Sequence, residues 1–149
     1  MSENKVTVKV VNKSNHNLPT YACKGDAGVD LKANLDSPIS IKPLERVLIP
    51  TGLYIKLPEG YELQIRPRSG NALKKGLTVL NTPGTIDENY IGPIGVILIN
   101  LSSETQIVNP GDRIAQAVLK QVSTIEWEEV KELPKTERGD GGFSHTGVK

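Results

Sequence analysis

Glycine and proline interrupt this chain so often that no long helix fits between them. The 149 residues include 14 glycines and 10 prolines, and both residue types are unfavourable inside helices. The intervals between them hold short runs of β-branched and aliphatic residues, a pattern typical of strands separated by turns. We therefore predict an all-β sandwich or barrel of about ten strands, with at most one short helix.

Most of the predicted strands show apolar residues alternating with polar ones, as a half-buried strand does. Val96 to Ile99 is different, because four apolar residues follow one another, and we predict a strand buried on both faces. Only Ser69 to Lys75 has helical composition. The runs that predict strands are residues 6–11, 39–41, 47–49, 53–57, 62–66, 96–99, 107–108, 114–119 and 125–130.

The length is typical of one domain, but the last residues change in character. From Lys135 onward the chain is charged and then rich in glycine, a composition that does not build a core. We expect residues 1–134 to form the β-barrel, and residues 135–149 to form a C-terminal arm that is mobile when nothing is bound.

Charge and composition exclude several classes of protein. The 18 Lys and Arg residues against 17 Asp and Glu give a net charge of +1, which does not predict a broad basic face for nucleic acid. No apolar run has the length of a membrane span, and the N-terminus lacks the apolar core of a signal peptide. The single cysteine, Cys23, fits a reducing compartment. We expect a cytoplasmic protein, or one of the host-cell cytoplasm or nucleus if the chain is viral.

The segment Asn81-Thr-Pro-Gly-Thr-Ile-Asp-Glu-Asn-Tyr90 carries the strongest chemical signal. Pro83 restricts the backbone and Gly84 tolerates unusual backbone angles, so Asp87 is predicted to lie in a rigid turn. A buried carboxylate there could act as a general base on water, and Tyr90 could stack on a flat ligand or a sugar. Taken alone, the segment reads more simply as an ordinary hairpin loop.

Three further segments place polar residues at the ends of predicted strands. Asp30 follows Gly28 at a strand start, where it is equally well a turn residue. Ser69 opens the predicted helix beside Arg68, either as a simple N-cap or as a phosphate ligand. Gln116 follows a Pro-Gly-Asp turn, and its amide could donate to a phosphate oxygen.

The glycine-rich tail contains the only phenylalanine of the chain, Phe143, and an arginine, Arg138. An aromatic ring flanked by glycines could close over a flat base, while the arginine and the glycine amides hold phosphates. A disordered tail is the simpler interpretation of this composition.

Together, and in this order, the five segments resemble the trimeric deoxyuridine triphosphate nucleotidohydrolase (dUTPase) family from Ala27 to Gly147. The Asn-Thr-Pro-Gly-Thr-Ile-Asp loop and the Arg-Gly-Asp-Gly-Gly-Phe tail are the specific motifs, and Gly-Asp-Arg-Ile-Ala-Gln is moderately specific. The resemblance implies a jelly-roll-like subunit, a homotrimer with shared active sites, and Mg²⁺-dependent hydrolysis of dUTP to dUMP and pyrophosphate.

The resemblance also implies a role for each matching residue. Asp87 would activate the attacking water, and Asp30 would act on Mg²⁺ through water molecules. The base and the sugar would be bound by Asn81, Tyr90 and Phe143. The phosphates would be bound by Arg68, Ser69, Gly70, Gln116, Arg138 and Ser144.

Three positions depart from the common pattern of the family. Asn71 stands where leucine is usual, Pro93 where an acidic residue is common, and Ser144 where glycine is frequent. None of these changes removes a predicted catalytic group. A dCTP deaminase on the same fold and a regulatory protein switched by dUTP binding remain alternatives.

Overall fold

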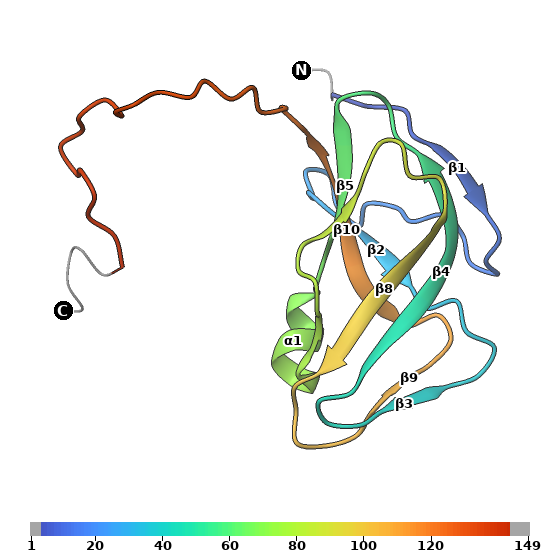
Figure 1. Ribbon diagram of the computed structural model, residues 1–149. Coiled ribbons are helices and arrows are strands. Elements are labelled where there is room, and N and C mark those ends of the chain that lie inside the picture. The colour runs from blue at the N-terminus through green and yellow to red at the C-terminus, as the bar shows by residue number, and fades with distance from the viewer. Residues whose placement is uncertain (1–3, 144–149) are drawn as a thin grey trace.

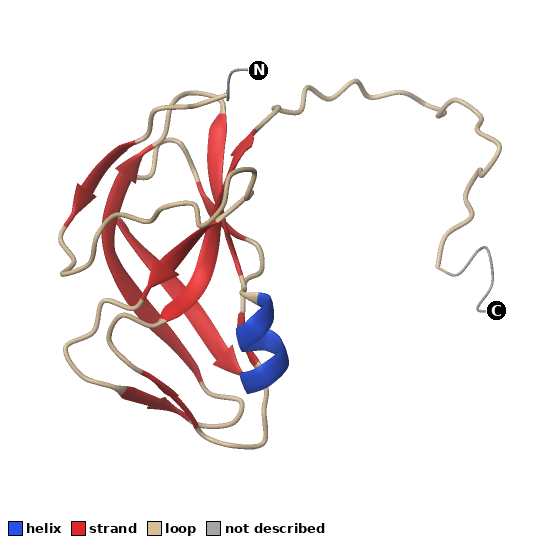
Figure 2. Cartoon of the chain, turned by 180° about the vertical axis from the view of Figure 1, so that it is seen from behind, coloured by secondary structure: helices blue, strands red, loops and turns tan. Residues whose placement is uncertain are grey.

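The computed structural model describes residues 4–143 and contains ten strands and one short helix (Figures 1 and 2). The predicted helix is confirmed as α1 (Ser69–Lys75). None of the described helices is long and apolar enough to span a membrane. The strands are β1 (Lys9–Asn12), β2 (Val29–Lys32), β3 (Ile39–Ile41), β4 (Arg46–Lys56), β5 (Tyr61–Arg66), β6 (Leu77–Val79), β7 (Gly84–Ile86), β8 (Pro93–Asn100), β9 (Gln106–Val108) and β10 (Arg113–Gln121).

Two four-stranded sheets form the body of the molecule. Their strand orders are β1-β4-β8-β6 and β2-β10-β5-β7, and β3 pairs with β9 in a separate two-stranded sheet. The strand pairs are antiparallel. Inward side chains of both large sheets meet in one apolar core, as in a closed β-sandwich or barrel. The core includes Leu31, Ile49, Ile65, Val96, Leu98 and Ala117.

The apolar runs 47–49 and 53–57 belong to a single long strand, β4, because the chain bulges between them without turning back. Gly52 lies in the bulge at a positive φ of 74°, where a residue with a Cβ atom would be strained. The hydroxyl of the buried Thr51 donates to the carbonyl oxygen of Ile94 at 2.7 Å. The irregular part of β4 is thereby joined to β8.

Strand β8 is buried on one face only, so the prediction of burial on both faces is wrong for the single chain. Val96 and Leu98 point into the core, whereas Ile97 and Ile99 are half-buried. Ile97 pairs with Leu48, which is 65 % exposed on the same sheet. The outer face of the β4–β8 pair is therefore apolar and uncovered.

The predicted strand at 125–130 is also wrong. After β10 the described chain has no regular secondary structure, and it runs away from the barrel as an extended segment (Figure 1). Trp127 is 85 % exposed, and Ile125 and Leu133 are exposed as well. The alternation of apolar and charged residues is that of a strand, but the segment has no partner strand in the part of its chain that the structure describes.

Candidate active site

Three of the predicted phosphate and metal residues come together from distant parts of the chain. Asp30 on β2 lies opposite Gln116 in the register of β2 and β10. The Arg68 Nε atom donates to the Asp30 Oδ1 atom at 2.9 Å, and the Gln116 side-chain amide donates to the Pro67 carbonyl oxygen at 3.0 Å. The end of β5 and the start of α1 are thus bound to β2 and β10 through the predicted site residues themselves.

Gly28 makes room for one of these residues. A Cβ atom at Gly28 would lie 2.7 Å from the Gln116 Oε1 atom and 3.3 Å from the Val118 side chain. The side chain of Gln116 therefore occupies the space that a larger residue at position 28 would fill. Glycine at position 28 thus allows the backbone before β2 to lie close to Gln116.

Arg113 belongs to the same cluster, although the sequence does not single it out. Its Nε atom lies 3.8 Å from the Asp30 Oδ2 atom. A register shift between Arg113 and Ala115 aligns Arg113 with Lys32 and Gln116 with Asp30. Residues three apart in a regular strand point to opposite faces, but this bulge puts Arg113 and Gln116 on the same face.

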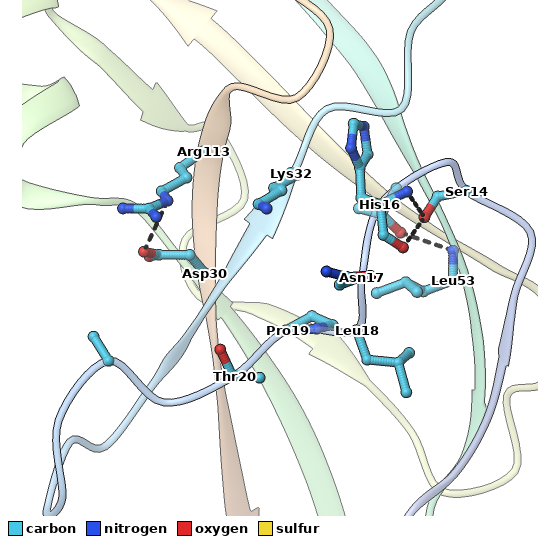
Figure 3. A pocket seen from close by; sticks show the side chains of 12 residues that line it. Ser14, His16, Asn17, Leu18, Pro19, Thr20, Asp30, Lys32, Leu53 and Arg113 are labelled. Atoms are coloured by element: carbon cyan, nitrogen blue, oxygen red, sulfur yellow. Dashed lines mark hydrogen bonds and ion pairs between the residues drawn. The ribbon is translucent and has the colours of Figure 1, made fainter.

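A cavity of about 270 Å³ lies beside Asp30 (Figure 3). Lys32 and Arg113 line the cavity near the carboxylate, and the segment 14–20 with His16 and Asn17 forms the other side. The ring of His16 packs on the turn before β10, since a Cβ atom at Gly111 would lie 3.2 Å from it. Two cations beside a single carboxylate leave an excess of positive charge, which suits an anionic ligand.

The start of α1 faces open space. Arg68, rather than Ser69, occupies the N-cap position, and no side chain caps the helix. The interpretation of Ser69 as a simple N-cap is therefore wrong, because Ser69 is the first helical residue. Nothing lies within 4 Å of the Cβ position at Gly70. Backbone N–H groups at an uncapped helix start are free to bind an anion.

Asn81, Asp87 and Tyr90 lie in the segment around β7, which pairs with β5. The Tyr90 backbone N–H donates to the Asp87 carbonyl oxygen at 3.1 Å, and the Tyr90 hydroxyl donates to the Pro93 carbonyl oxygen at 2.7 Å. A Cβ atom at Gly92 would lie 2.6 Å from that hydroxyl, so glycine leaves room for the ring.

All three of these side chains are exposed in the single chain. The expectation of a buried carboxylate at Asp87 is therefore wrong for the single chain. Asp87 and Tyr90 line a largely apolar cavity of about 580 Å³ on the outer face of the β4–β8 pair. Leu48, Pro50 and Ile97 form much of its wall. A surface of this kind is the usual sign of a binding or assembly face.

The Asp87 group and the Asp30 group remain separate within one chain. Among residues 4–143, no hydrogen bond or ion pair connects Asp87 or Tyr90 to Asp30, Arg68 or Gln116. Arg68 lines a different cavity, of about 350 Å³, with Asn71, Lys75 and Arg113. Within the described part of one chain, the predicted water-activating and phosphate-binding residues therefore form two separate groups.

The arm holds its predicted residues away from both groups (Figure 1). The Arg138 Nε atom donates to the Gly141 carbonyl oxygen at 2.6 Å in a local turn. Phe143 is fully exposed. Ser144 and His145 lie outside the described residues.

The donor set limits how a metal ion can be bound. Within residues 4–143, no three His, Cys, Asp or Glu side chains are grouped so that they could hold an ion together. Asp30 is one-third exposed, and its Oδ2 atom has only a 3.8 Å contact. One accessible carboxylate fits Mg²⁺ that keeps its water molecules and is bound mainly by a phosphorylated ligand.

Comparison with known proteins identifies the family of this chain. The family model for dUTPase matches residues 5–147. The deoxyuridine 5'-triphosphate nucleotidohydrolase of Fusobacterium nucleatum is 52% identical over 96% of this chain and 98% of its own length. The enzyme of that name from Finegoldia magna is 53% identical over 94% of this chain and 98% of its own length.

Solved structures show the same fold. A mutant dUTPase of Staphylococcus bacteriophage 80alpha with dUpNHpp superposes with a TM-score of 0.82 at 26% identity, over 97% of this chain and 100% of the other. A mutant dUTPase from phage phi11 of S. aureus, described with a structural Mg(II) ion, gives a TM-score of 0.77 at 25% identity, over 87% of this chain and 100% of the other. The expectation of an all-β, jelly-roll-like subunit is confirmed, and the chain belongs to the dUTPase family.

Proposed function

We propose that this protein is a dUTP diphosphatase, which hydrolyses dUTP to dUMP and pyrophosphate by attack of water on the α-phosphorus. The observation that carries the proposal is the cluster of Asp30, Arg68 and Gln116, formed by three distant segments of a chain in the dUTPase family. This activity keeps uracil out of DNA and supplies dUMP for thymidylate synthesis. We propose that it operates in the cytoplasm.

The triphosphate binds where α1 begins. The Arg68 guanidinium and the Gln116 amide donate to phosphate oxygens, and the hydroxyl of Ser69 and the N–H of Gly70 complete the set. The Arg68 Nε atom donates to Asp30, and the Gln116 amide donates to the carbonyl oxygen of Pro67. The Nη groups of Arg68 and the second amide N–H of Gln116 are the donors that would bind phosphate, so the protein holds both side chains in place for the substrate.

Asp30 is the residue that would hold Mg²⁺, through the water molecules of the ion. When bound, Mg²⁺ reduces the negative charge on the triphosphate and keeps the phosphates in one conformation. Arg113 and Lys32 beside Asp30 add to the positive potential on this side of the site.

Asp87 orients the attacking water and accepts its proton as general base. Asn81 hydrogen-bonds the uracil ring, and Tyr90 packs against the deoxyribose and excludes a 2′-hydroxyl. The hydroxyl of Tyr90 is fixed on the carbonyl oxygen of Pro93, so its ring has a defined position for this role. The reaction needs no covalent intermediate, because a positioned water is the nucleophile.

A homotrimer completes the site. The separation of the Asp87 group from the Asp30 group supports a site to which one subunit gives the phosphate residues and another gives the hairpin with Asp87. A third subunit gives the arm, with Arg138 and Ser144 on the phosphates and Phe143 over the uracil ring. The uncovered apolar face of β4 and β8 and the exposed Trp127 support burial between copies.

The test is pyrophosphate release from dUTP, dCTP, dTTP and UTP, each with Mg²⁺ and with a chelator. Release from dUTP alone, which the chelator reduces, is the expected result. Ammonia and dUTP formed from dCTP would instead identify a deaminase. Tight binding of dUTP by folded protein without turnover would overturn the proposal in favour of a binding protein.

A further inference from the structure

Helix α1 carries two predicted phosphate ligands, yet few contacts hold its N-terminal end. None of its seven residues is buried, no side chain caps it, and it packs mainly against β6. Its C-terminal end is better fixed, because the Leu101 N–H donates to the Gly76 carbonyl oxygen at 2.8 Å. A Cβ atom at Gly76 would lie 2.9 Å from the backbone nitrogen of Ser102, so the two backbones are in close contact there.

Three side-chain hydrogen bonds connect the N-terminal end of α1 and the residues before it to the sheet. Arg68 donates to Asp30, and Gln116 donates to the Pro67 carbonyl oxygen. The third joins the Asn71 Nδ2 atom to the Arg113 carbonyl oxygen at 2.9 Å. Asn71 is also the only residue of α1 that is half-buried, the others being exposed.

Two of these three hydrogen bonds use groups that the proposed reaction needs. When the triphosphate and Mg²⁺ bind, Arg68 and Gln116 donate to phosphate, and Asp30 accepts from water on the ion. The ligand then shares these side chains with the protein, since the Arg68 guanidinium and the Gln116 amide each have further N–H groups beside the one bound to Asp30 or to Pro67. The bond from Asn71 involves a backbone carbonyl oxygen of β10 and a side chain without a role in the chemistry, so it persists in the complex.

We infer that Asn71 is a positioning residue: its amide keeps the start of α1 at a constant place on β10 while Arg68, Asp30 and Gln116 take up contacts to the ligand. This hydrogen bond joins two segments of the proposed site: the start of α1, with Ser69 and Gly70, and the part of β10 with Arg113 and Gln116. Errors in the placement of phosphate ligands affect the transition state most, because in-line attack requires one geometry whereas initial binding tolerates several. The inference rests on the proposed function for its kinetic consequence.

Asn71→Ala and Leu73→Ala form a matched pair that tests the inference. Both substitutions place alanine on the same helix, and neither changes the charge. Alanine has a higher helix propensity than asparagine or leucine, so neither substitution weakens the helix itself. The two positions differ in that Asn71 donates to the Arg113 carbonyl oxygen, whereas the Leu73 side chain is 87 % exposed. For dUTP we expect Asn71→Ala to lower kcat about threefold to tenfold, as for the loss of one hydrogen bond, with KM changed by less than about twofold. Leu73→Ala should match the wild type, and Asn71→Gln, which keeps an amide donor, should lose less than Asn71→Ala.

A second readout does not depend on activity. Amide hydrogen exchange of residues 67–72 should become faster in Asn71→Ala while exchange in β5 and β10 stays unchanged. Faster exchange in Asn71→Ala, found together with a wild-type protein that does not hydrolyse dUTP, would refute the proposed function and leave the positioning role intact. Unchanged exchange and an unchanged kcat in Asn71→Ala, or a lower melting temperature with wild-type kcat, would overturn the inference.

Discussion

Asp87 is the residue on which the proposed chemistry depends most. Its carboxylate is exposed in a turn beside Tyr90, so in the proposed trimer it is free to bind a water molecule between subunits. We predict that Asp87→Asn lowers kcat by about 10³-fold and leaves the dissociation constant for dUTP nearly unchanged, because a positioned general base acts on the chemical step. Rapid-quench turnover and equilibrium titration measure the two quantities.

The neighbouring carboxylate gives the control. Glu88 lies in the same turn, and its backbone carbonyl oxygen accepts from Lys56, so Glu88→Gln removes a charge at the same place without touching the predicted base. Its kcat should stay within about twofold of wild type. Equal losses in both variants would assign the effect to local charge and would remove Asp87 from its role as base.

Gly28 provides a second prediction at the residue scale. Because a Cβ atom would meet the Gln116 Oε1 atom at 2.7 Å, Gly28→Ala should displace the Gln116 amide and lower kcat/KM for dUTP by about tenfold. The same change made in a Gln116→Ala background should have almost no further effect, since the displaced group is absent. Additive losses in this double-mutant cycle would show that Gly28 acts through something else.

At the scale of elements, the described part of the arm makes its contacts within itself rather than with the barrel. Beyond β10 the described segment runs away from the barrel, and the turn at Arg138 is made within the arm. A chain that stops after Glu137 should therefore have the melting temperature of the full chain. Its kcat/KM for dUTP should fall about 100-fold, because a charge-assisted phosphate contact and an aromatic stack are removed together.

Two point variants divide that loss between the groups. Arg138→Ala should show the part of the loss in kcat/KM that comes from the phosphate contact. Phe143→Ala should show the part that comes from stacking on uracil. A truncated chain with full activity would exclude the lid role of the arm. A truncated chain with a lower melting temperature would show that the arm supports the fold, and the division into residues 1–134 and 135–149 would then be wrong.

At the scale of the whole molecule, the prediction is a trimer of about 49 kDa, which is three times 16.2 kDa, in light scattering after size exclusion. Shared sites make a sharper test possible. Asp87→Asn trimers lack the base, and trimers truncated after Glu137 lack the arm. If the two chains are refolded together in equal amounts, about one site in four combines an intact hairpin with an intact arm and should regain activity.

The same mixture made without refolding is the control and should stay inactive until subunits exchange. No recovery in the refolded mixture, although both chains are present in trimers, would mean that one chain supplies both the base and the arm to each site. A monomer with full activity would contradict the shared site directly.

Local chemistry explains how much of this protein can be predicted from the sequence. Glycines and prolines exclude long helices whatever the tertiary structure, and the helical composition of Ser69 to Lys75 yields α1 with the same bounds. The motif around Asp87 and the tail around Phe143 are short enough to be recognised as continuous sequence. These features depend on neighbouring residues, and so the sequence by itself determined the fold class, the helix and the family.

Tertiary structure decided the features that depend on distant residues. A bulge in β10 turns Arg113 toward Asp30, Gln116 occupies the space beside Gly28, and Asn71 reaches the carbonyl oxygen of Arg113. Residues 125–130 have the pattern of a strand but no partner strand among the described residues 4–143. Side-chain direction and strand pairing are set by contacts between segments that a linear pattern does not encode, and for that physical reason only the folded chain reveals them.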